Sequence, residues 1–117
     1  MIIRIWHGRT APERADEYAA FLQRTAIPDY RGVPGNEGAL VLRRAGTAGD
    51  EFLTVSLWTS LDAIRGFHGD DIEVAKYYEE DEEFLLEFEP TVVHYEVVEA
   101  EISDELRAGT GRVAASR

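Results

Sequence analysis

The chain has 117 residues, no cysteine and a formal net charge of −11, and 44% of its residues are hydrophobic. This length fits one domain with one core. The lack of cysteine excludes disulfides, thiolate chemistry and cysteine-ligated metal centres, and it fits a cytoplasmic protein. Because nucleic acid and anionic membrane surfaces repel an acidic chain, we expect neither as a partner.

The charge is concentrated in the second half of the chain. Residues 70–105 contain fifteen acidic residues and one base, Lys76. We interpret this region as a solvated face, because the acidic run 79–83 lacks the spacing of a calcium loop. No metal site is therefore expected. No apolar run approaches the ~20 residues of a membrane span, and the N-terminus is typical of a strand rather than a signal peptide.

The first elements are a strand and a helix. Residues 2–9 alternate, with Ile3 and His7 on one face, which is typical of a strand. Thr10 precedes a proline and a glutamate and is expected to be the N-cap of a helix. Apolar residues then follow helical spacing as far as Pro28.

The middle of the chain predicts a hairpin and further helices. Residues 39–44 and 51–58 read as two strands joined by a short glycine-containing turn. Ser60 is the expected N-cap of the next helix. A second helical stretch is expected to start near Asp70, and residues 82–88 are expected to add a short helical turn.

The last predicted strand covers residues 91–99 and completes a β-α-β-β-α-β order. This is the ferredoxin-like split βαβ pattern of an α+β fold, a four-stranded antiparallel sheet with helices on one face. Both sheet faces carry large apolar side chains, so we expect a second subunit to cover the open face in a homodimer. Residues 1–101 form the expected domain, and residues 102–117 a tail that is flexible or packs on the partner.

Four segments carry a resemblance to a known family. They are the first strand ending at Trp6, Leu57–Ser60, Phe67–Gly69 and Val93–Val97. Over residues 2–99 the chain resembles the antibiotic biosynthesis monooxygenase family of the dimeric α+β barrel superfamily. The resemblance implies a homodimer with a pocket between sheet and helices in each subunit. It also implies oxidation of aromatic, polyketide-like small molecules by dioxygen, with no metal or flavin cofactor.

The same fold is compatible with two other functions. Haem-degrading relatives use an asparagine on the first strand and a tryptophan and a histidine on the second helix. By offset these positions correspond to His7, Phe67 and Tyr77, so none of the three is retained and haem degradation is not expected. A non-catalytic dimer that binds a small molecule or a partner protein stays open as the alternative, since fold alone does not determine function.

The candidate site residues are histidines and aromatic residues near the expected pocket. A histidine can act as general base on a phenol, and a tyrosine can donate to a substrate carbonyl. The expected catalytic residues are His68, Tyr77 and His7, and the expected substrate-binding residues are Trp58, Phe67 and His94. For each of them a structural role is the alternative. No histidine spacing supports a metal triad.

Arginines also lie inside the expected strands. Arg4 and Arg43 both occupy strand positions. A strand arginine on a buried face needs an acidic partner. We expect Glu96, on the last strand, to pair with such an arginine in a structural role.

Overall fold

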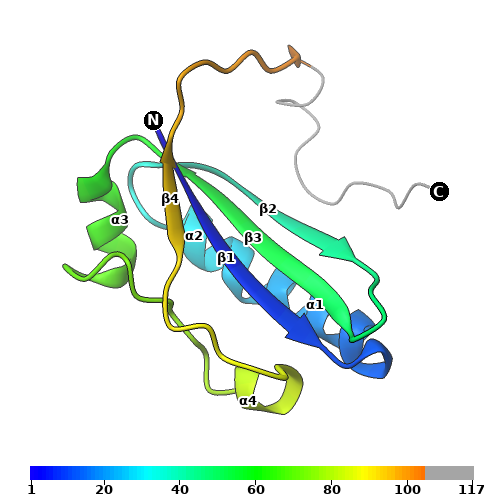
Figure 1. The fold of residues 1–117 in the computed structure, drawn as a ribbon. Helices are drawn as coiled ribbons and strands as arrows, with labels where there is room; N and C mark the ends of the chain where they lie inside the picture. Colours follow the sequence, from blue (N-terminus) through cyan, green and yellow to red (C-terminus); the bar gives the residue numbers. More distant parts are fainter. Residues whose placement is uncertain (105–117) are drawn as a thin grey trace.

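The computed structural model describes residues 1–104 (Figure 1). The elements in chain order are β1 (Ile2–Thr10), a 3-10 turn η1 (Pro12–Arg14), α1 (Ala15–Arg24), α2 (Ala26–Arg31), β2 (Asn36–Arg44), β3 (Asp50–Trp58), α3 (Leu61–His68), α4 (Asp81–Phe84) and β4 (Val93–Glu96). None of the described helices is long and apolar enough to span a membrane.

The four strands form one antiparallel sheet in the order β2-β3-β1-β4. β1 and β3 are central and pair along their full lengths, from Ile2 opposite Trp58 to Thr10 opposite Asp50. β2 and β3 form the expected hairpin, with an irregularity between Asn36 and Gly38. The α+β split βαβ fold predicted from the sequence is confirmed.

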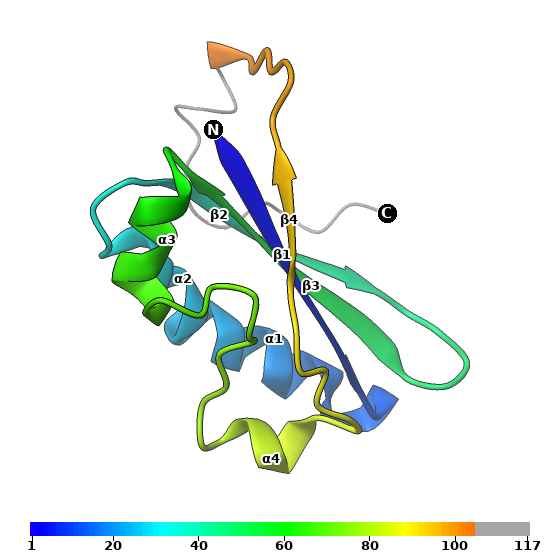
Figure 2. The same cartoon turned by 60° about the vertical axis from the view of Figure 1, so that its left-hand side comes forward.

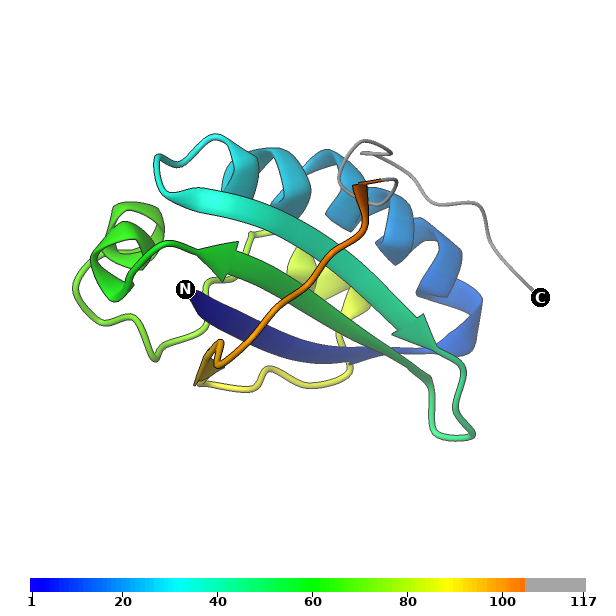
Figure 3. The ribbon, with the colours of Figure 1, turned by 90° about the horizontal axis from the view of Figure 1, so that it is seen from above.

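The helices α1 and α2 pack on one face of the sheet (Figures 1 and 3). Side chains of β1 and β3 alternate between this covered face and the opposite, open face. Phe52 of β3 is fully buried beneath α1, where its ring lies edge-on to Tyr18 at 5.2 Å between centroids. Burial of such a ring is favoured by about 1.5–3 kcal/mol, so these aromatic rings fix the helices on the sheet.

The open face is apolar over much of its area and uncovered in the single chain. Leu40 and Leu42 of β2 are 46% and 43% exposed, and Val93 and Tyr95 of β4 are 50% and 57% exposed. Ile5, at the centre, pairs with both β3 and β4. The expected grouping of the odd-numbered β1 residues on one face is therefore confirmed.

The first helical region differs from the prediction at both ends. The residue that caps η1 is Ala11, and the hydroxyl of Thr10 is buried with no partner among the described residues. Pro28 does not end the helix. The helix is interrupted at Thr25 instead, and α2 continues through Pro28. Pro28 lies in the first turn of α2, where the backbone N–H groups have no partner within the helix, so its missing N–H costs no hydrogen bond.

The second helical region is shorter than predicted. Ser60 caps α3 as expected, because its Oγ accepts a hydrogen bond from the backbone N of Ala63 at 3.2 Å. The helix expected from Asp70 does not form. Residues 69–80 are irregular, and their backbone pairs instead with the segment that precedes β4, including Ala75 N to Pro90 O at 3.0 Å. Figure 2 shows this segment joining α3 to α4.

The last strand is also shorter than expected. β4 contains only Val93–Glu96 of the predicted strand 91–99, although Thr91 forms an isolated bridge with Val74. Most of the predicted tail, residues 105–117, lies outside the described residues.

Candidate functional site

A pocket lies on the covered face of the sheet, against α1, α2 and the segment before α4. Its lining comprises Arg4, Trp6, Tyr18, Leu22, Ala26, Tyr30, Thr54, Lys76, Tyr78 and Asp81. The cavity has a volume of about 20 Å³, which is room for about one water molecule. A larger ligand therefore enters only when the side chains that wall the pocket move.

Arg4 contributes the most deeply buried cation of this lining. It is 2% exposed, because its even-numbered position on β1 faces the helices. Its Nη2 donates to the backbone oxygen of Val74 at 3.1 Å, and its Nε has no partner among the described residues. Burial lowers the pKa of the Arg4 guanidinium, although an arginine side chain stays protonated in proteins.

The second cation, Lys76, is already neutralised. Its Nζ lies 3.0 Å from Oδ2 of Asp29, and the hydroxyl of Tyr78 donates to the same carboxylate oxygen at 2.6 Å. Burial of Asp29 opposes its ionisation, but the hydrogen bonds from Tyr78 and Lys76 outweigh that effect and lower its pKa. Lys76 and Asp29 therefore form a charge pair at the edge of the pocket.

Asp81 is the carboxylate of the lining. It is 2% exposed at the start of α4 and accepts hydrogen bonds from the Tyr18 hydroxyl at 3.0 Å and the Tyr78 backbone N at 2.6 Å. Burial raises the pKa of Asp81, and the two hydrogen bonds do not cancel this effect. A buried carboxylate with a raised pKa is a candidate proton acceptor.

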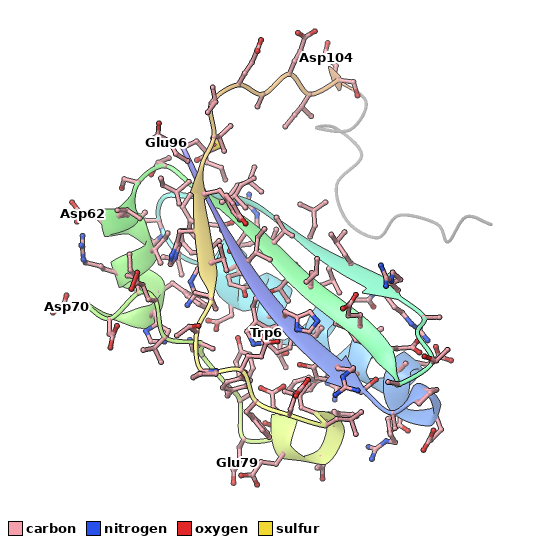
Figure 4. The ribbon with its side chains drawn as sticks, viewed as in Figure 1. Trp6, Asp62, Asp70, Glu79, Glu96 and Asp104 are labelled. Atoms are coloured by element: carbon pink, nitrogen blue, oxygen red, sulfur yellow. The ribbon has the colours of Figure 1, made fainter. Side chains whose placement is uncertain are left out.

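Aromatic and hydroxyl groups form the other walls. The Trp6 ring lies 6.4 Å from the Tyr18 ring, and the hydroxyls of Tyr30 and Thr54 share a hydrogen bond of 2.9 Å. Figure 4 places Trp6 near the middle of the sheet and Glu79 at the far end of the molecule. The walls thus offer flat ring faces and a few polar groups, a pattern common in small-molecule sites.

The six residues predicted from the sequence do not line this pocket. Trp58 and Phe67 are brought together, with ring centroids 5.7 Å apart in the core. Phe67 then separates Trp58 from the cations, since Arg4 and Lys76 approach its ring at 5.4 Å and 4.4 Å from the centroid. Both predicted binding residues therefore lie directly behind the lining.

His7 and Tyr77 meet at another place, on Glu89. Nδ1 of His7 lies 2.6 Å from Oε1 of Glu89, and the Tyr77 hydroxyl donates to the backbone oxygen of Glu89 at 2.5 Å. Nε2 of His7 lies 3.1 Å from Oε2 of Glu51. Since His7 alternates with Trp6 along β1, His7 and its two carboxylate partners lie on the open side of the sheet. The Tyr77 ring instead lies edge-on to the pocket residue Trp6, at 6.1 Å between centroids.

The other two histidines each have an unsatisfied nitrogen. Nδ1 of His68 and Nε2 of His94 are buried and have no partner among the described residues. His94 lies directly opposite Arg4 in the β1–β4 register. Burial and the charge of Arg4 lower the pKa of His94. Within residues 1–104, no three His, Asp or Glu side chains are placed to hold a metal ion.

Sequence reasoning missed the charged groups of the pocket. The expected pairing of Arg4 with Glu96 is not found among the described ion pairs, and Arg43 pairs with Asp16 and Asp50 instead. Glu96 is exposed and lies opposite Ile2 in the register. The burial of Arg4 could have been predicted from its position two residues from Trp6, because residues at this spacing lie on the same face of a strand.

Known proteins provide an independent comparison with this fold. Over 87% of its length the chain matches a protein of Bacillus cereus assigned to the antibiotic biosynthesis monooxygenases, covering 97% of that protein with a TM-score of 0.60 and 14% identity. It matches the monooxygenase ActVA-Orf6 of Streptomyces coelicolor, solved in complex with nanaomycin D, with a TM-score of 0.56 and 18% identity, over 88% of this chain and 92% of that one. At these identities the likeness shows the fold alone.

A family model matches the sequence itself. None of the curated proteins searched matches the chain. The model of the antibiotic biosynthesis monooxygenase family matches residues 1–72, which is more than half of the chain and covers β1 to α3. The chain therefore belongs to the antibiotic biosynthesis monooxygenase family.

Proposed function

We propose that this protein is a small enzyme that oxidises an aromatic, polyketide-like molecule with dioxygen and without a bound cofactor. The observation that carries the proposal is the pocket of the covered face, which is lined both by the aromatic residues Trp6, Tyr18 and Tyr30 and by the charged residues Arg4 and Asp81. Membership of the monooxygenase family supports the reaction class.

The chemistry requires a substrate that supplies its own electrons. A phenol that loses its proton transfers electrons to dioxygen, one oxygen atom bonds to a ring carbon, and the other leaves as water. The balance is one phenol and one dioxygen for one quinone and one water, so no external reductant is consumed. The protein holds the ring and accepts the proton. Asp81 is the candidate for that proton, because it is the carboxylate of the lining and its pKa is raised.

A non-catalytic, ligand-binding role is the second candidate. The cavity of about 20 Å³ supports it, because a site that holds about one water is not preformed for an aromatic substrate. The absence of His7, His68 and Tyr77 from the lining supports it as well. The two functions share the pocket and differ in whether dioxygen is consumed.

We also propose that two copies pair through their open sheet faces. The face bears exposed Leu40 and Leu42 on one edge strand, β2, and exposed Val93 and Tyr95 on the other, β4. Val55 of β3 and Ile5 of β1 lie between Leu40 and Val93 in the register and join the two edges into one apolar surface. Contiguous apolar patches of this kind mark interaction surfaces. A second copy presents the same patch, so an isologous contact covers both faces at once.

Oxygen uptake by the purified protein tests the oxidation. A set of mono- and polycyclic phenols is incubated with the protein under air, and dioxygen consumption is followed together with quinone absorbance. We expect one dioxygen consumed per quinone formed, and loss of the rate in Asp81→Asn but not in Asp62→Asn, which changes an exposed carboxylate. Phenols that bind without dioxygen consumption would support the non-catalytic role instead.

A further inference from the structure

Within residues 1–104, Arg4 is a buried cation without a carboxylate partner. Its side chain is 2% exposed, its described polar partners are the backbone oxygen of Val74 and the Tyr30 hydroxyl, and its Nε is unpartnered among the described residues. Burying a charge is costly unless it is paired and hydrogen-bonded. The free chain therefore leaves part of this cost uncompensated.

The missing partner is conspicuous in so acidic a chain. There are 23 acidic residues for 12 basic ones, and several arginines nearer the surface lie beside carboxylates. Arg43 lies 2.7 Å from Asp16 and 3.0 Å from Asp50, and Arg9 lies 3.1 Å from Glu87. Lys76, which shares the pocket with Arg4, is held by Asp29. Arg4 is thus the cation of the lining without a carboxylate beside it among the described ion pairs, and the lining carboxylate Asp81 is bound by the Tyr18 hydroxyl and the Tyr78 backbone N instead.

A second unsatisfied group lies beside Arg4. His94 is its direct neighbour on β4, and Nε2 of His94 is buried with no described partner. A neutral imidazole carries one N–H, so it can donate to an oxyanion. Adjacent strands therefore present a guanidinium and an imidazole, with the Phe67 ring 5.4 Å from the Arg4 guanidinium carbon.

We propose that Arg4, which lines the pocket, binds an anionic oxygen, phenolate or carboxylate, carried by the aromatic ligand of the pocket, and that His94, its neighbour on β4 just outside the lining, assists it. The inference rests on the proposed function only in taking the pocket as the ligand site. A guanidinium recognises a planar oxyanion by paired, charge-assisted hydrogen bonds. The neighbouring ring faces of Trp6 and Tyr30 suit the aromatic part of such a ligand.

Binding measurements with matched probes test the charge requirement. The affinity of the wild-type protein for 2-naphthoate is compared with its affinity for the neutral isostere 2-naphthamide by titration calorimetry. The anion is expected to bind at least about tenfold more tightly, since a hydrogen bond to a charged group contributes that much. A second experiment measures the affinity for 4-nitro-1-naphthol below and above the pKa of this naphthol. Tighter binding of the ionised form would identify a site that accepts a phenolate as well as, or instead of, a carboxylate. The proposal would be overturned if 2-naphthoate and 2-naphthamide bound with equal affinity, or if neither 2-naphthoate nor the ionised naphthol bound.

Variants locate the effect on the two residues. Arg4→Met keeps most of the apolar stem and is expected to lose the preference for the anion over the amide. Arg4→Lys is expected to retain part of this preference, and His94→Leu is expected to reduce it. Arg43→Met is the matched control, because Arg43 is a strand arginine paired with acids outside the lining, and its preference should stay that of the wild type. An unchanged preference in Arg4→Met would contradict the assignment.

The stability of the ligand-free protein gives a second test, because replacing a purely structural arginine would lower the free energy of unfolding. Removing an unpaired buried charge is expected to leave the free energy of unfolding of Arg4→Met unchanged or raised. Adding 2-naphthoate should raise the melting temperature of the wild type more than that of the variant. The binding data also separate this inference from the oxidation, because anion preference without dioxygen uptake would retain the Arg4 site and reject the enzyme.

Discussion

The imidazole of His7 on β1 and the carboxylate of Glu89 just before β4 meet at 2.6 Å on the open side of the sheet. A second carboxylate, that of Glu51, lies 3.1 Å from the other ring nitrogen. Burial of His7 opposes its protonation, but the hydrogen bonds and charges of Glu89 and Glu51 outweigh this and raise the pKa of His7. Both carboxylates receive a hydrogen bond at once only while the histidine is charged, because a neutral imidazole carries one N–H.

The stability of the protein should therefore fall with pH in a defined range. A raised pKa in the folded state means that His7 contributes stability fully below its unfolded value of about 6.5 and loses it as the pH rises through the higher folded value. His7→Gln should abolish this slope in urea unfolding followed between pH 6 and 9. His68→Gln serves as the control and should keep the slope. A wild-type protein equally stable across this range would contradict the role of the cluster.

The pairing of open faces predicts a charge-sensitive dimer. Leu40 is 46% exposed in the single chain and lies opposite Val55 on the open face. Leu40→Glu should change the stability of the monomer by less than about 0.5 kcal/mol, but it would place an unpaired carboxylate in each half of the interface and dissociate the dimer.

Sedimentation velocity at micromolar concentration measures this effect. Ala20→Glu, which adds the same charge at an exposed position of α1, is the matched control and should stay dimeric. A monomeric wild type, or a Leu40→Glu variant that dimerises as tightly as the control, would rule out the sheet-to-sheet contact.

The parts of the fold that follow from local pattern were predictable. The alternation of β1 placed Ile3 and His7 on one face, and the hydroxyl of Ser60 marked the start of α3. Residues 69–80 could not be assigned in this way. Their spacing resembles a helix, but backbone bonds such as Val92 N to Glu73 O at 2.9 Å join them to a segment distant in the sequence. Such non-local pairing overrides local spacing.

The site was less predictable than the fold because its chemistry depends on burial. The sequence predicted His7 as a catalytic residue, yet His7 lies on the open face and its carboxylate partners come from other segments. Arg4 and Asp81 acquire their significance only when the chain folds, since both are 2% exposed and both line the pocket. An aspartate within an acidic run gives no signal of its burial.

The position of Trp6 depends on the absence of a side chain at Gly8. A Cβ at Gly8 would lie 2.7 Å from Cζ2 of Trp6 and closer still to Cη2. Trp6 is 6% exposed and cannot move aside freely. Gly8→Ala should therefore destabilise the protein by about 1–3 kcal/mol and shift the tryptophan emission.

Another strand glycine controls for the change in backbone. At Gly38 the nearest atom to a new Cβ is Cδ1 of Leu57 at 3.9 Å, an ordinary contact. Gly38→Ala should leave the urea midpoint unchanged or raise it. The role of Gly8 would be refuted if both variants unfolded at the same urea concentration.

Asp81 links stability to the proposed reaction. Its pKa is raised by burial above the usual value near 3.8, so the folded state binds a proton that the unfolded state has released between these two values. Stability is highest below the unfolded pKa and declines as the pH rises through the folded one. Once ionised, the buried carboxylate is therefore a cost that the hydrogen bonds from Tyr18 and Tyr78 only partly offset.

Asp81→Asn should remove this cost while keeping the hydrogen bonds. The amide oxygen can accept from the Tyr78 backbone N, and the amide NH₂ can donate to the Tyr18 hydroxyl. We expect a protein that is at least as stable as the wild type at pH 7, with a flatter stability profile between pH 4 and 7, and that no longer consumes dioxygen. Thermal unfolding across this range, with Asp62→Asn as the exposed control, measures the first two effects. A lower melting temperature at pH 7 together with full oxygen uptake would show that Asp81 is structural, because a proton acceptor in the pocket cannot be replaced by an amide without loss of the reaction.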